Sequence, residues 1–404
     1  MSEPRLVVLS TLFPHAGQPN AGLFVRERMF RVGQRFPLVV VSPQPWFPLQ
    51  WLIRRFRPGY RPPAPHHEEQ QGFDVFFPRF LALPGILRRL DGFSMALGCL
   101  PTLLRLRKTF GVNLIDAHFA YPSGHAASLL GHWLRLPVTI TLRGTEPGHA
   151  RQPALRKRVV AALAGATRVF AVSDSLKQLA VGLGIPGAKV RVVGNGVDLS
   201  RFRPVARDES RRSLSLPVAA RVLISVGGLV ERKGFHRVID CLPAIAARFP
   251  NIIYLVVGGG SPEGDMTDEL KLRARRLGLA DRVVFTGPVA PNDLSQWLSA
   301  ADVFVLATRN EGWANVFLEA MACGLPVVTT DVGGNTEVVC REDLGTIVPF
   351  GDGPALQRAI EQALDRAWDR SAIMAYARDN SWEKRIEVLA GEFNRLVDTA
   401  GASQ

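Results

Sequence analysis

A strand–loop–helix–strand pattern at residues 302–331 constrains the fold of this chain more than any other feature. Residues 303–307 and 325–330 are short apolar, β-branched runs, typical of strands buried in a parallel sheet. Between them, Asn315 is a good N-cap, residues 316–323 carry a helical stretch, and Gly324 stops it. A helix that connects two parallel strands starts at the sheet edge where α/β proteins bind ligands, and its unpaired N–H groups attract phosphate. The pattern therefore predicts an α/β fold with an anion site at this helix start.

Two glutamates lie on either side of the predicted helix start. Glu311 precedes it in the loop, and Glu319 follows about one turn inside the helix. Carboxylates are poor ligands for phosphate but good acceptors for the hydroxyl groups of sugars. A nucleotide sugar offers both features, because its diphosphate suits the helix start while its ribose and hexose suit the glutamates. We therefore expect a nucleotide-sugar donor as a ligand.

The segment Glu311-Gly-Trp-Ala-Asn-Val-Phe-Leu-Glu319 resembles the E-x7-E signature of retaining glycosyltransferases of family four. Further segments similar to that family follow its order: Asn195-Gly-Val-Asp198, residues 226–234, 257–260 and 285–289, and Val332-Gly-Gly-Asn-Thr-Glu-Val338. The resemblance implies the GT-B architecture. In this α/β architecture two Rossmann-like, doubly wound domains face each other across a cleft, and a C-terminal helix crosses back to the N-terminal domain. It also implies a hexosyltransferase of cell-surface polysaccharide or glycoconjugate biosynthesis.

Length and patterning indicate two domains. At 404 residues the chain is long enough for two cores, and both halves alternate apolar runs with helical stretches. A charged seam at residues 198–213 separates the halves. We predict an N-terminal acceptor-binding domain at residues 1–200, a donor-binding domain at 201–380 and a last helix at 381–404. Residues 43–84 are rich in Pro and Arg and have few periodic elements, so we expect a long excursion there.

Several patterns bear on the compartment. No apolar run reaches the length of a membrane span, and we expect Pro101 to break the longest candidate, at residues 92–104. Residues 6–13 indicate a first strand rather than a signal peptide. The four cysteines show no metal-binding spacing, which favours buried thiols in a reducing cytoplasm. We expect a cytoplasmic enzyme that needs no metal and no cofactor.

Positive charge is concentrated in the first half of the chain. Residues 1–201 contain 26 Lys and Arg against 10 Asp and Glu, whereas residues 202–404 contain 23 against 26. Much of this charge adjoins apolar residues, as at 51–57, 86–90 and 103–108. Such segments can lie on an anionic membrane surface, each basic residue adding about 1 kcal/mol. We expect a peripheral enzyme on the inner face of the plasma membrane. The alternatives are a composition that places arginine at any solvated position, and nucleic-acid binding, which no motif supports.

Candidate donor-site residues follow predicted strands in the second half. Arg232 and Lys233 can reach a diphosphate, a role that the resemblance gives to Lys233; the alternative is a solvated charge at a helix start. Glycines allow close approach to a nucleotide, and neither a G-x-G-x-x-G nor a P-loop motif is present. Gly228 stands where family members commonly have arginine, and we expect Arg232 to replace that charge. The predicted donor-binding residues are Gly17, Gly22, Asn195, Gly228, Gly258, Gly260, Val289, Asn315, Val316 and Glu319.

The first half offers fewer candidates. Gly17 and Gly22, with Asn20 between them, form a glycine loop after the first strand, where we expect the transferred sugar and the acceptor to meet. Arg143 and Glu146 stand where many relatives have His-Gly-x-Asp. Arginine cannot act as a base but can hold a phosphate of the donor or of a lipid-linked acceptor. His118 ends a predicted strand, and it is either a cleft residue or a structural histidine.

The predicted mechanism is front-face transfer with retention. The resemblance assigns no carboxylate nucleophile, which a double displacement would need. We expect Arg232, Lys233 and the helix start to stabilise the departing diphosphate, which takes the acceptor proton. Glu311 would orient the hexose, Glu319 would hold the ribose, and the acceptor would be a saccharide or lipid-linked. Two alternatives remain at this point: a GT-B nucleotide-sugar epimerase and a non-catalytic nucleotide-sugar-binding protein.

Overall fold

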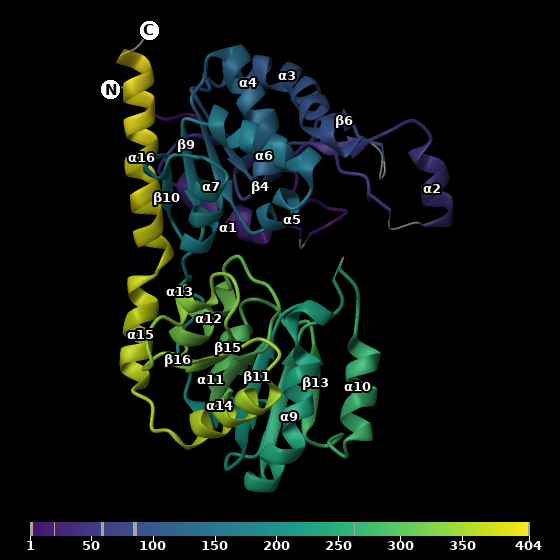
Figure 1. Cartoon of the computed structure of the whole chain (residues 1–404), viewed down its shortest axis with the longest axis vertical. Coiled ribbons are helices and arrows are strands. Elements are labelled where there is room, and N and C mark those ends of the chain that lie inside the picture. The colour runs from purple at the N-terminus through teal and green to yellow at the C-terminus, as the bar shows by residue number, and fades with distance from the viewer. Residues whose placement is uncertain (1–2, 20, 58–59, 84–86, 262, 403–404) are drawn as a thin grey trace. The chain divides into compact units, whose positions relative to one another are not determined.

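The computed structural model describes residues 3–19, 21–57, 60–83, 87–261 and 263–402, without the side chains of the last two. The chain forms two compact units (Figure 1). The first comprises Met1–Gly194 together with Arg385–Gln404, and the second comprises Asn195–Lys384. Asn20, part of the expected glycine loop, lies outside the described residues, as do Pro84 and Ile86 at the ends of two expected segments.

An eight-stranded sheet is the centre of the first unit, with the strand order β10-β9-β8-β7-β1-β2-β5-β4. Each strand is parallel to its neighbours except β4, which is antiparallel to β5. The strands are β1 (Leu6–Leu9), β2 (Leu38–Val41), β4 (His67–Gln70), β5 (Phe73–Phe76), β7 (Leu114–His118), β8 (Val138–Leu142), β9 (Arg168–Ala171) and β10 (Val190–Val192). The central strands β1, β7 and β8 are buried along their whole length, and β1 is accordingly an unbroken apolar run.

Helices connect these strands and pack on the sheet (Figure 1). They are α1 (Leu23–Gly33), α2 (Gln50–Phe56), α3 (Asp91–Thr109), α4 (His125–Leu134), α5 (Glu146–Ala150), α6 (Pro153–Gly165) and α7 (Asp174–Gly182), with short turns η1 (Arg88–Leu90), η2 (Ala120–Gly124) and η3 (Gly187–Lys189). The end of α16 (Trp382–Ala402) also belongs to this unit. Its Glu392 lies 2.9 Å from Arg168 Nε and also pairs with Arg191, and its Phe393 ring contacts Phe170.

The second unit is built on a six-stranded parallel sheet with the order β13-β12-β11-β14-β15-β16. The strands are β11 (Arg221–Val226), β12 (Ile252–Val257), β13 (Val283–Gly287), β14 (Val303–Leu306), β15 (Val327–Thr330) and β16 (Gly345–Val348). Its helices are α8 (Arg207–Ser213), α9 (Phe235–Arg248), α10 (Thr267–Arg276), α11 (Leu294–Ala300), α12 (Asn315–Ala322), α13 (Asn335–Val338), α14 (Gly353–Asp365) and α15 (Arg370–Asp379), with the turn η4 (Glu231–Lys233).

Side chains that alternate along the strands of the second sheet pack into two separate hydrophobic cores, one on each face of the sheet. Val222 and Ile224 of β11 pack on one face with Phe317 of α12. Leu223, between them, packs on the other face with Val238 of α9. Both faces are therefore covered by helices, which is the doubly wound arrangement. The predicted α/β fold with two Rossmann-like domains is confirmed.

Each sheet reverses its direction of strand addition once. In the second unit the chain runs outward from β11 through β12 and β13 and then returns to place β14 beside β11. In the first unit β7 takes the same position beside β1. Open α/β sheets usually bind ligands beside the carboxyl ends of the strands at such a switch point. The topology therefore predicts that the functional residues of each unit lie at the carboxyl-terminal end of its sheet.

Four local expectations were wrong. The expected excursion at 43–84 contains β3 (Gln44–Trp46), α2, β4, β5 and β6 (Arg79–Leu81); its strands are too short, and too often interrupted by proline, to show a clear period. The helix α3 continues through Pro101 instead of ending there. Asn315 is the first helical residue of α12, and Ala314 is its N-cap. Cys340 is exposed, whereas the other three cysteines are buried.

Candidate active site

The predicted donor-site residues of the second unit follow the carboxyl ends of its strands. Arg232 and Lys233 lie in η4 after β11, and Glu311 lies in the loop after β14. Gly258 and Gly260 follow β12, and Val289 follows β13, where its partly buried side chain packs on the core. Because all six strands are parallel, these loops all lie at the carboxyl-terminal end of the sheet. The loops after β11 and β14 are neighbours at the switch point.

Glu311 is the centre of a charged cluster at this switch point. Its Oε1 accepts hydrogen bonds from Lys233 Nζ at 2.7 Å and from Arg232 Nη1 at 3.2 Å. Thr308 Oγ1 donates to the same oxygen at 3.2 Å. The Glu311 side chain is only 10% exposed, so these contacts hold it in one position. The structure therefore brings together three of the residues that the sequence predicts for catalysis.

Glu263 completes this cluster, and no sequence motif predicts it. Arg232 donates to both Glu263 oxygens, at 2.9 Å from Nε and 2.7 Å from Nη2. This hydrogen bonding raises the pKa of Arg232 and lowers that of Glu263 from their ordinary values. Two cations therefore face two carboxylates, and a diphosphate must compete with Glu263 for Arg232. Glu263 lies in a loop without a motif, whereas Thr308 follows β14 so closely that its position alone could have identified it.

Two glycines let the backbone pack tightly beneath the cluster. A Cβ atom on Gly333 would lie 1.8 Å from the carbonyl oxygen of Glu311, and one on Gly258 would lie 1.9 Å from that of Gly227. Both residues also have positive φ angles, +53° and +141°. At Gly228, by contrast, a Cβ would meet Ser261 at 3.2 Å, and at Gly260 it would meet the Asp265 carboxylate at 2.7 Å. A side chain at Gly333 or Gly258 would therefore clash with the backbone, whereas one at Gly228 or Gly260 would have to displace a neighbouring side chain.

Helix α12 carries the remaining predicted residues of the donor half. Asn315 Oδ1 accepts a hydrogen bond from Asn195 Nδ2 at 2.8 Å, so these two predicted residues are in contact. No side chain caps the start of the helix, whose first turn contains Asn315 and Val316. Glu319 is half-buried and lies four residues after Asn315, on the same face of the helix. The start of α12 and the Glu319 carboxylate therefore lie side by side.

His118 and Arg143 form a second group, in the first unit. They end β7 and follow β8, respectively, and Arg143 Nη2 lies 3.0 Å from His118 Nδ1. His118 is fully buried, with Nε2 3.3 Å from Asp116 Oδ2. Burial first, and then the nearby Arg143 charge, lower the pKa of His118 to about 4. The imidazole is therefore neutral at pH 7, and its Nδ1 accepts from the guanidinium and orients it.

The Glu146 carboxylate accepts hydrogen bonds from three backbone N–H groups. Its Oε2 accepts from the N–H groups of Arg143 and Gly144, at 3.2 and 2.8 Å, and its Oε1 accepts from Ala120 N–H at 3.1 Å. Such bonds fix the loop that carries Arg143. Asp116 is equally occupied, because Thr139 Oγ1 donates to its Oδ1 at 2.5 Å. Both buried carboxylates of this group hold the arrangement in place.

Gly17 and Gly22 lie in the loop that follows β1, at the switch point of the first sheet. Gly22 has a φ of +67°, and a Cβ there would lie 2.2 Å from the Leu12 carbonyl oxygen. Gly17 N–H donates to His15 Nδ1 at 3.1 Å. The predicted residues thus form two groups, one at the switch point of each unit. Among the described residues, no cluster of three or more His, Cys, Asp or Glu side chains could hold a metal ion.

Comparison with known proteins decides the family. The sequence pattern described as Glycosyltransferase Family 4 matches residues 56–201, and that described as Glycosyl transferases group 1 matches residues 206–380. The D-inositol 3-phosphate glycosyltransferase of Corynebacterium urealyticum is 30% identical over 304 residues, which are 70% of this chain and 72% of that protein. The chain belongs to glycosyltransferase family four. The resemblance of its motifs to that family is confirmed.

One further relative and one solved structure are also similar to this chain. TuaC of Bacillus subtilis, whose name refers to teichuronic acid biosynthesis, is 29% identical over 339 residues, 82% of each chain. The crystal structure of Anabaena HepE in complex with UDP and glucose superposes with a TM-score of 0.73 at 22% identity, over 98% of this chain and 100% of that one. At this identity the superposition shows the shared fold of this family-four glycosyltransferase.

Proposed function

We propose that this enzyme transfers a hexose, with retention of configuration, from a UDP- or GDP-linked donor to a lipid-linked or saccharide acceptor in cell-surface polysaccharide biosynthesis. The contact of Lys233 and Arg232 with Glu311, at the β11–β14 switch point, carries the proposal. UDP is the favoured nucleotide, because HepE was crystallised with UDP and glucose. The polymer named for TuaC supports an acceptor that is part of a surface glycan.

We assign each part of the donor to a group of residues that could bind it. Lys233, Arg232 and the N–H groups at the start of α12 supply positive charge for the diphosphate. Glu311, held by its two cations, would accept from hexose hydroxyls with its remaining lone pairs. Glu319, one turn into α12, would accept from the ribose. Gly258, Gly260 and Val289 would lie against the nucleoside.

A front-face mechanism fits the hydrogen bonds that the carboxylates of Glu311 and Glu146 accept. Glu311 is hydrogen-bonded to two cations, and Glu146 accepts from three backbone N–H groups. Carboxylates stabilised in this way are weak nucleophiles, which disfavours a covalent glycosyl intermediate. Fixed cations instead stabilise the charge that develops on the departing diphosphate, and the diphosphate takes the proton of the acceptor hydroxyl. Neutral His118 would act as a positioning residue for Arg143.

We place the enzyme at the cytoplasmic face of the plasma membrane as a peripheral protein. No helix within the described residues is long and apolar enough to span a bilayer. Helix α2 exposes Trp51 and Phe56, at 65% and 78%, beside Arg55 and Arg57. Aromatic rings next to arginines suit the interface of an anionic leaflet. The excess of basic residues in the first half supports the same location.

Two substitutions test the donor site directly. Glu319→Ala should weaken UDP binding about tenfold or more, because loss of a charged hydrogen-bond acceptor costs about 1.5–3 kcal/mol. Glu311→Gln should leave UDP affinity unchanged or raise it, since it frees Lys233, but should lower turnover strongly. Calorimetric titration with UDP and a radiolabelled transfer assay measure the two effects. The reverse pattern would show that the two roles are exchanged.

A donor screen tests the reaction itself. Thermal shift with UDP-, GDP- and ADP-sugars identifies the donor, because a ligand at 100 times its Kd stabilises the fold by about 2.7 kcal/mol. Product analysis with the chosen donor then requires an acceptor for a transferase. Epimerised or free sugar nucleotide formed without an acceptor would identify an epimerase. Binding without any turnover would indicate a silent binding protein.

A further inference from the structure

A small two-stranded ribbon in the first unit organises a surface that the donor site does not use. Strands β3 and β6 are parallel and pair Gln44 with Arg79 and Trp46 with Leu81. Paired residues of parallel strands point to the same side, and Phe80, between Arg79 and Leu81, is buried. Gln44, Trp46, Arg79 and Leu81 therefore share the open face of the ribbon.

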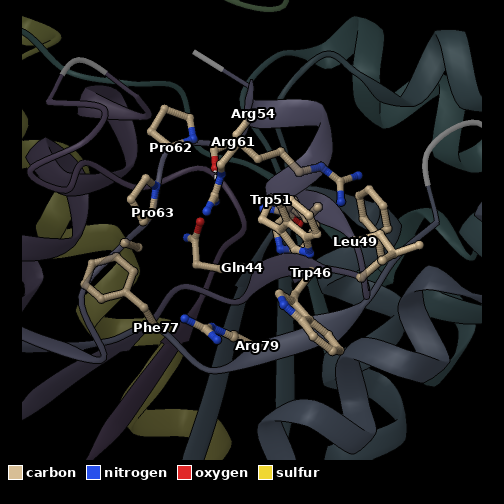
Figure 2. Close-up of a pocket in the computed structure, with 14 residues that line it drawn as sticks. Gln44, Trp46, Leu49, Trp51, Arg54, Arg61, Pro62, Pro63, Phe77 and Arg79 are labelled. Carbon is tan, nitrogen blue, oxygen red and sulfur yellow. Dashed lines mark hydrogen bonds between the residues drawn. The ribbon is translucent and has the colours of Figure 1, made fainter. Parts of the chain in front are cut away.

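One half of this face is an aromatic pocket, which we define by Gln44, Trp46, Trp51, Arg61, Phe77 and Arg79 (Figure 2). The cavity measures about 190 Å³, which suits a compact headgroup. Its walls are flat rings, which offer apolar faces to the C–H side of a pyranose. Amide and guanidinium groups between the rings can bond to hydroxyl or phosphate oxygens. The pocket therefore combines the two chemistries that a sugar phosphate presents.

Among the described residues, no carboxylate forms an ion pair with Arg54, Arg61 or Arg79, the arginines that line the cavity, although the Asp91 carboxylate attracts Arg61 electrostatically. Arg61 Nη1 donates to the Ala82 carbonyl oxygen at 3.0 Å, and Arg54 Nη2 donates to the Arg61 carbonyl oxygen at 2.5 Å. These bonds hold the guanidinium groups in place without cancelling their charge. No Asp or Glu is among the residues that line this cavity. The pocket is therefore preorganised for an anion.

The other half is an apolar groove of about 540 Å³ beside the pocket. Six apolar side chains that are each at least 39% exposed line it: Leu81, Leu83, Leu87, Leu90, Phe93 and Leu97. Leu90, Phe93 and Leu97 recur at helical spacing on one side of α3, where a solvated helix would have polar residues. One carboxylate, Asp91, lines the groove, and burial raises its pKa to about 6. Contiguous exposed apolar surface of this kind marks a binding site.

Arg79 joins the two halves, because it lines both the pocket and the groove. Along this stretch of chain, Phe77, Arg79 and Leu81 alternate, and Figure 2 shows Arg79 between Phe77 and Trp46. The order is therefore ring, cation, aliphatic chain. A lipid-linked sugar phosphate has the same order of sugar, anion and alkyl chain.

We propose that the aromatic pocket and the apolar groove form the acceptor site for a lipid-linked sugar phosphate. The alkyl chain lies along Leu90, Phe93 and Leu97, and the phosphate binds Arg79. The sugar occupies the aromatic pocket on the Phe77 side of Arg79, beside Gln44 and Arg61. The proposal rests on the proposed function and specifies its acceptor.

The far end of the pocket adjoins the switch point of the first sheet. A Cβ on Gly17 would lie 3.0 Å from Pro62 Cβ, so the glycine loop packs on the pocket wall. His15, in the same loop, contacts the Phe77 ring edge-on with centroids 5.6 Å apart. The sugar end of the ligand therefore points toward the loop where the transferred sugar is expected, and the alkyl chain points away from it.

Monomeric dodecyl phosphate is the test ligand, followed by tryptophan fluorescence because Trp46 and Trp51 line the pocket. Inorganic phosphate supplies the charge alone, and an uncharged dodecyl polyoxyethylene ether supplies the chain without charge or sugar. We expect dodecyl phosphate to bind at least tenfold tighter than either. Equal binding of dodecyl phosphate and the dodecyl ether would show that no anion site exists and would overturn the proposal.

Matched variants separate a site from general adsorption. Arg79→Gln and Leu97→Ser should each weaken dodecyl phosphate binding at least fivefold, whereas Arg276→Gln and Leu272→Ser on α10 should not. Leu97 and Leu272 are similarly exposed, at 50% and 44%. If Arg79→Gln and Leu97→Ser change only binding to anionic vesicles, the surface is a membrane contact and the acceptor site is wrong. UDP titrations distinguish a failure of this proposal from a failure of the proposed function. A parent enzyme that does not bind UDP contradicts the proposed function and not the acceptor site.

Discussion

At the scale of single residues, the charge balance of the proposed donor site decides how it could bind a diphosphate. Lys233 and Arg232 contact Glu311, and Arg232 contacts Glu263 as well. The phosphate oxygens of a donor must therefore displace a carboxylate from at least one cation. Glu263 is the candidate for displacement, because its side chain is 54% exposed whereas that of Glu311 is 10% exposed.

Replacement of Glu263 by Gln should therefore strengthen UDP binding. An exposed ion pair contributes about 0–1 kcal/mol, so release of Arg232 should raise affinity up to about fivefold. Calorimetric titration at low and high salt measures the effect, which should shrink as salt rises. Asp240→Asn is the matched control, since Asp240 pairs with Arg273 on the same unit. Weaker UDP binding by the Glu263 variant would mean that this carboxylate helps to hold the donor.

His118 should make stability depend on pH. Its folded pKa of about 4 lies below the ordinary 6.5, so the unfolded chain binds the proton first as pH falls. The stability that neutral His118 contributes is complete above pH 6.5 and is lost progressively toward pH 4, by about 3 kcal/mol. Urea unfolding at several pH values should show this loss for the parent and a smaller one for His118→Asn. An unchanged slope in the variant would contradict the assignment.

At the scale of elements, the loop that carries Glu311 depends on one glycine of the next loop. Gly333→Ala would place a methyl group 1.8 Å from the Glu311 carbonyl oxygen, and the loop would have to move. We expect a large loss of transfer activity with a destabilisation of about 2 kcal/mol or more. Gly351→Ala is the control, because Gly351 also has a positive φ but nothing lies within 4 Å of its added Cβ. Comparable activity of the two variants would remove the steric argument.

Some elements could be predicted from the sequence and others could not, for physical reasons. Strands such as β1 and β14 are buried on both faces, so their unbroken apolar runs predicted them. Strands β3 and β6 escaped prediction because three-residue strands leave no measurable period. Lys233 and Glu311 could be predicted as partners because both follow strands at one sheet edge. Glu263 and the aromatic pocket could not, since their chemistry arises only when segments without a motif fold together.

At the scale of the whole molecule, the uneven distribution of charge predicts where the enzyme works. The ten Lys and Arg residues of segment 44–108, against four Asp and Glu, lie in the stretch that also contains most of the enzyme's exposed large apolar side chains. In Arg54, the guanidinium is bound to backbone carbonyl groups of residues 60 and 61. Arg55 and Arg57, on and just after α2, are therefore the cations to test for lipid contact.

Replacement of Arg55 and Arg57 by Gln should weaken binding to anionic vesicles without changing UDP affinity. Each basic residue near the surface contributes about 1 kcal/mol, so the double variant should lose roughly thirtyfold in vesicle affinity at low salt. The loss should shrink as the Debye length falls from about 30 Å at 0.01 M salt to about 8 Å at 0.15 M. Flotation with neutral and anionic vesicles measures it, with Arg275 and Arg276 of α10 replaced in the control. Equal flotation with both kinds of vesicle would mean that the basic first half serves another purpose than membrane contact.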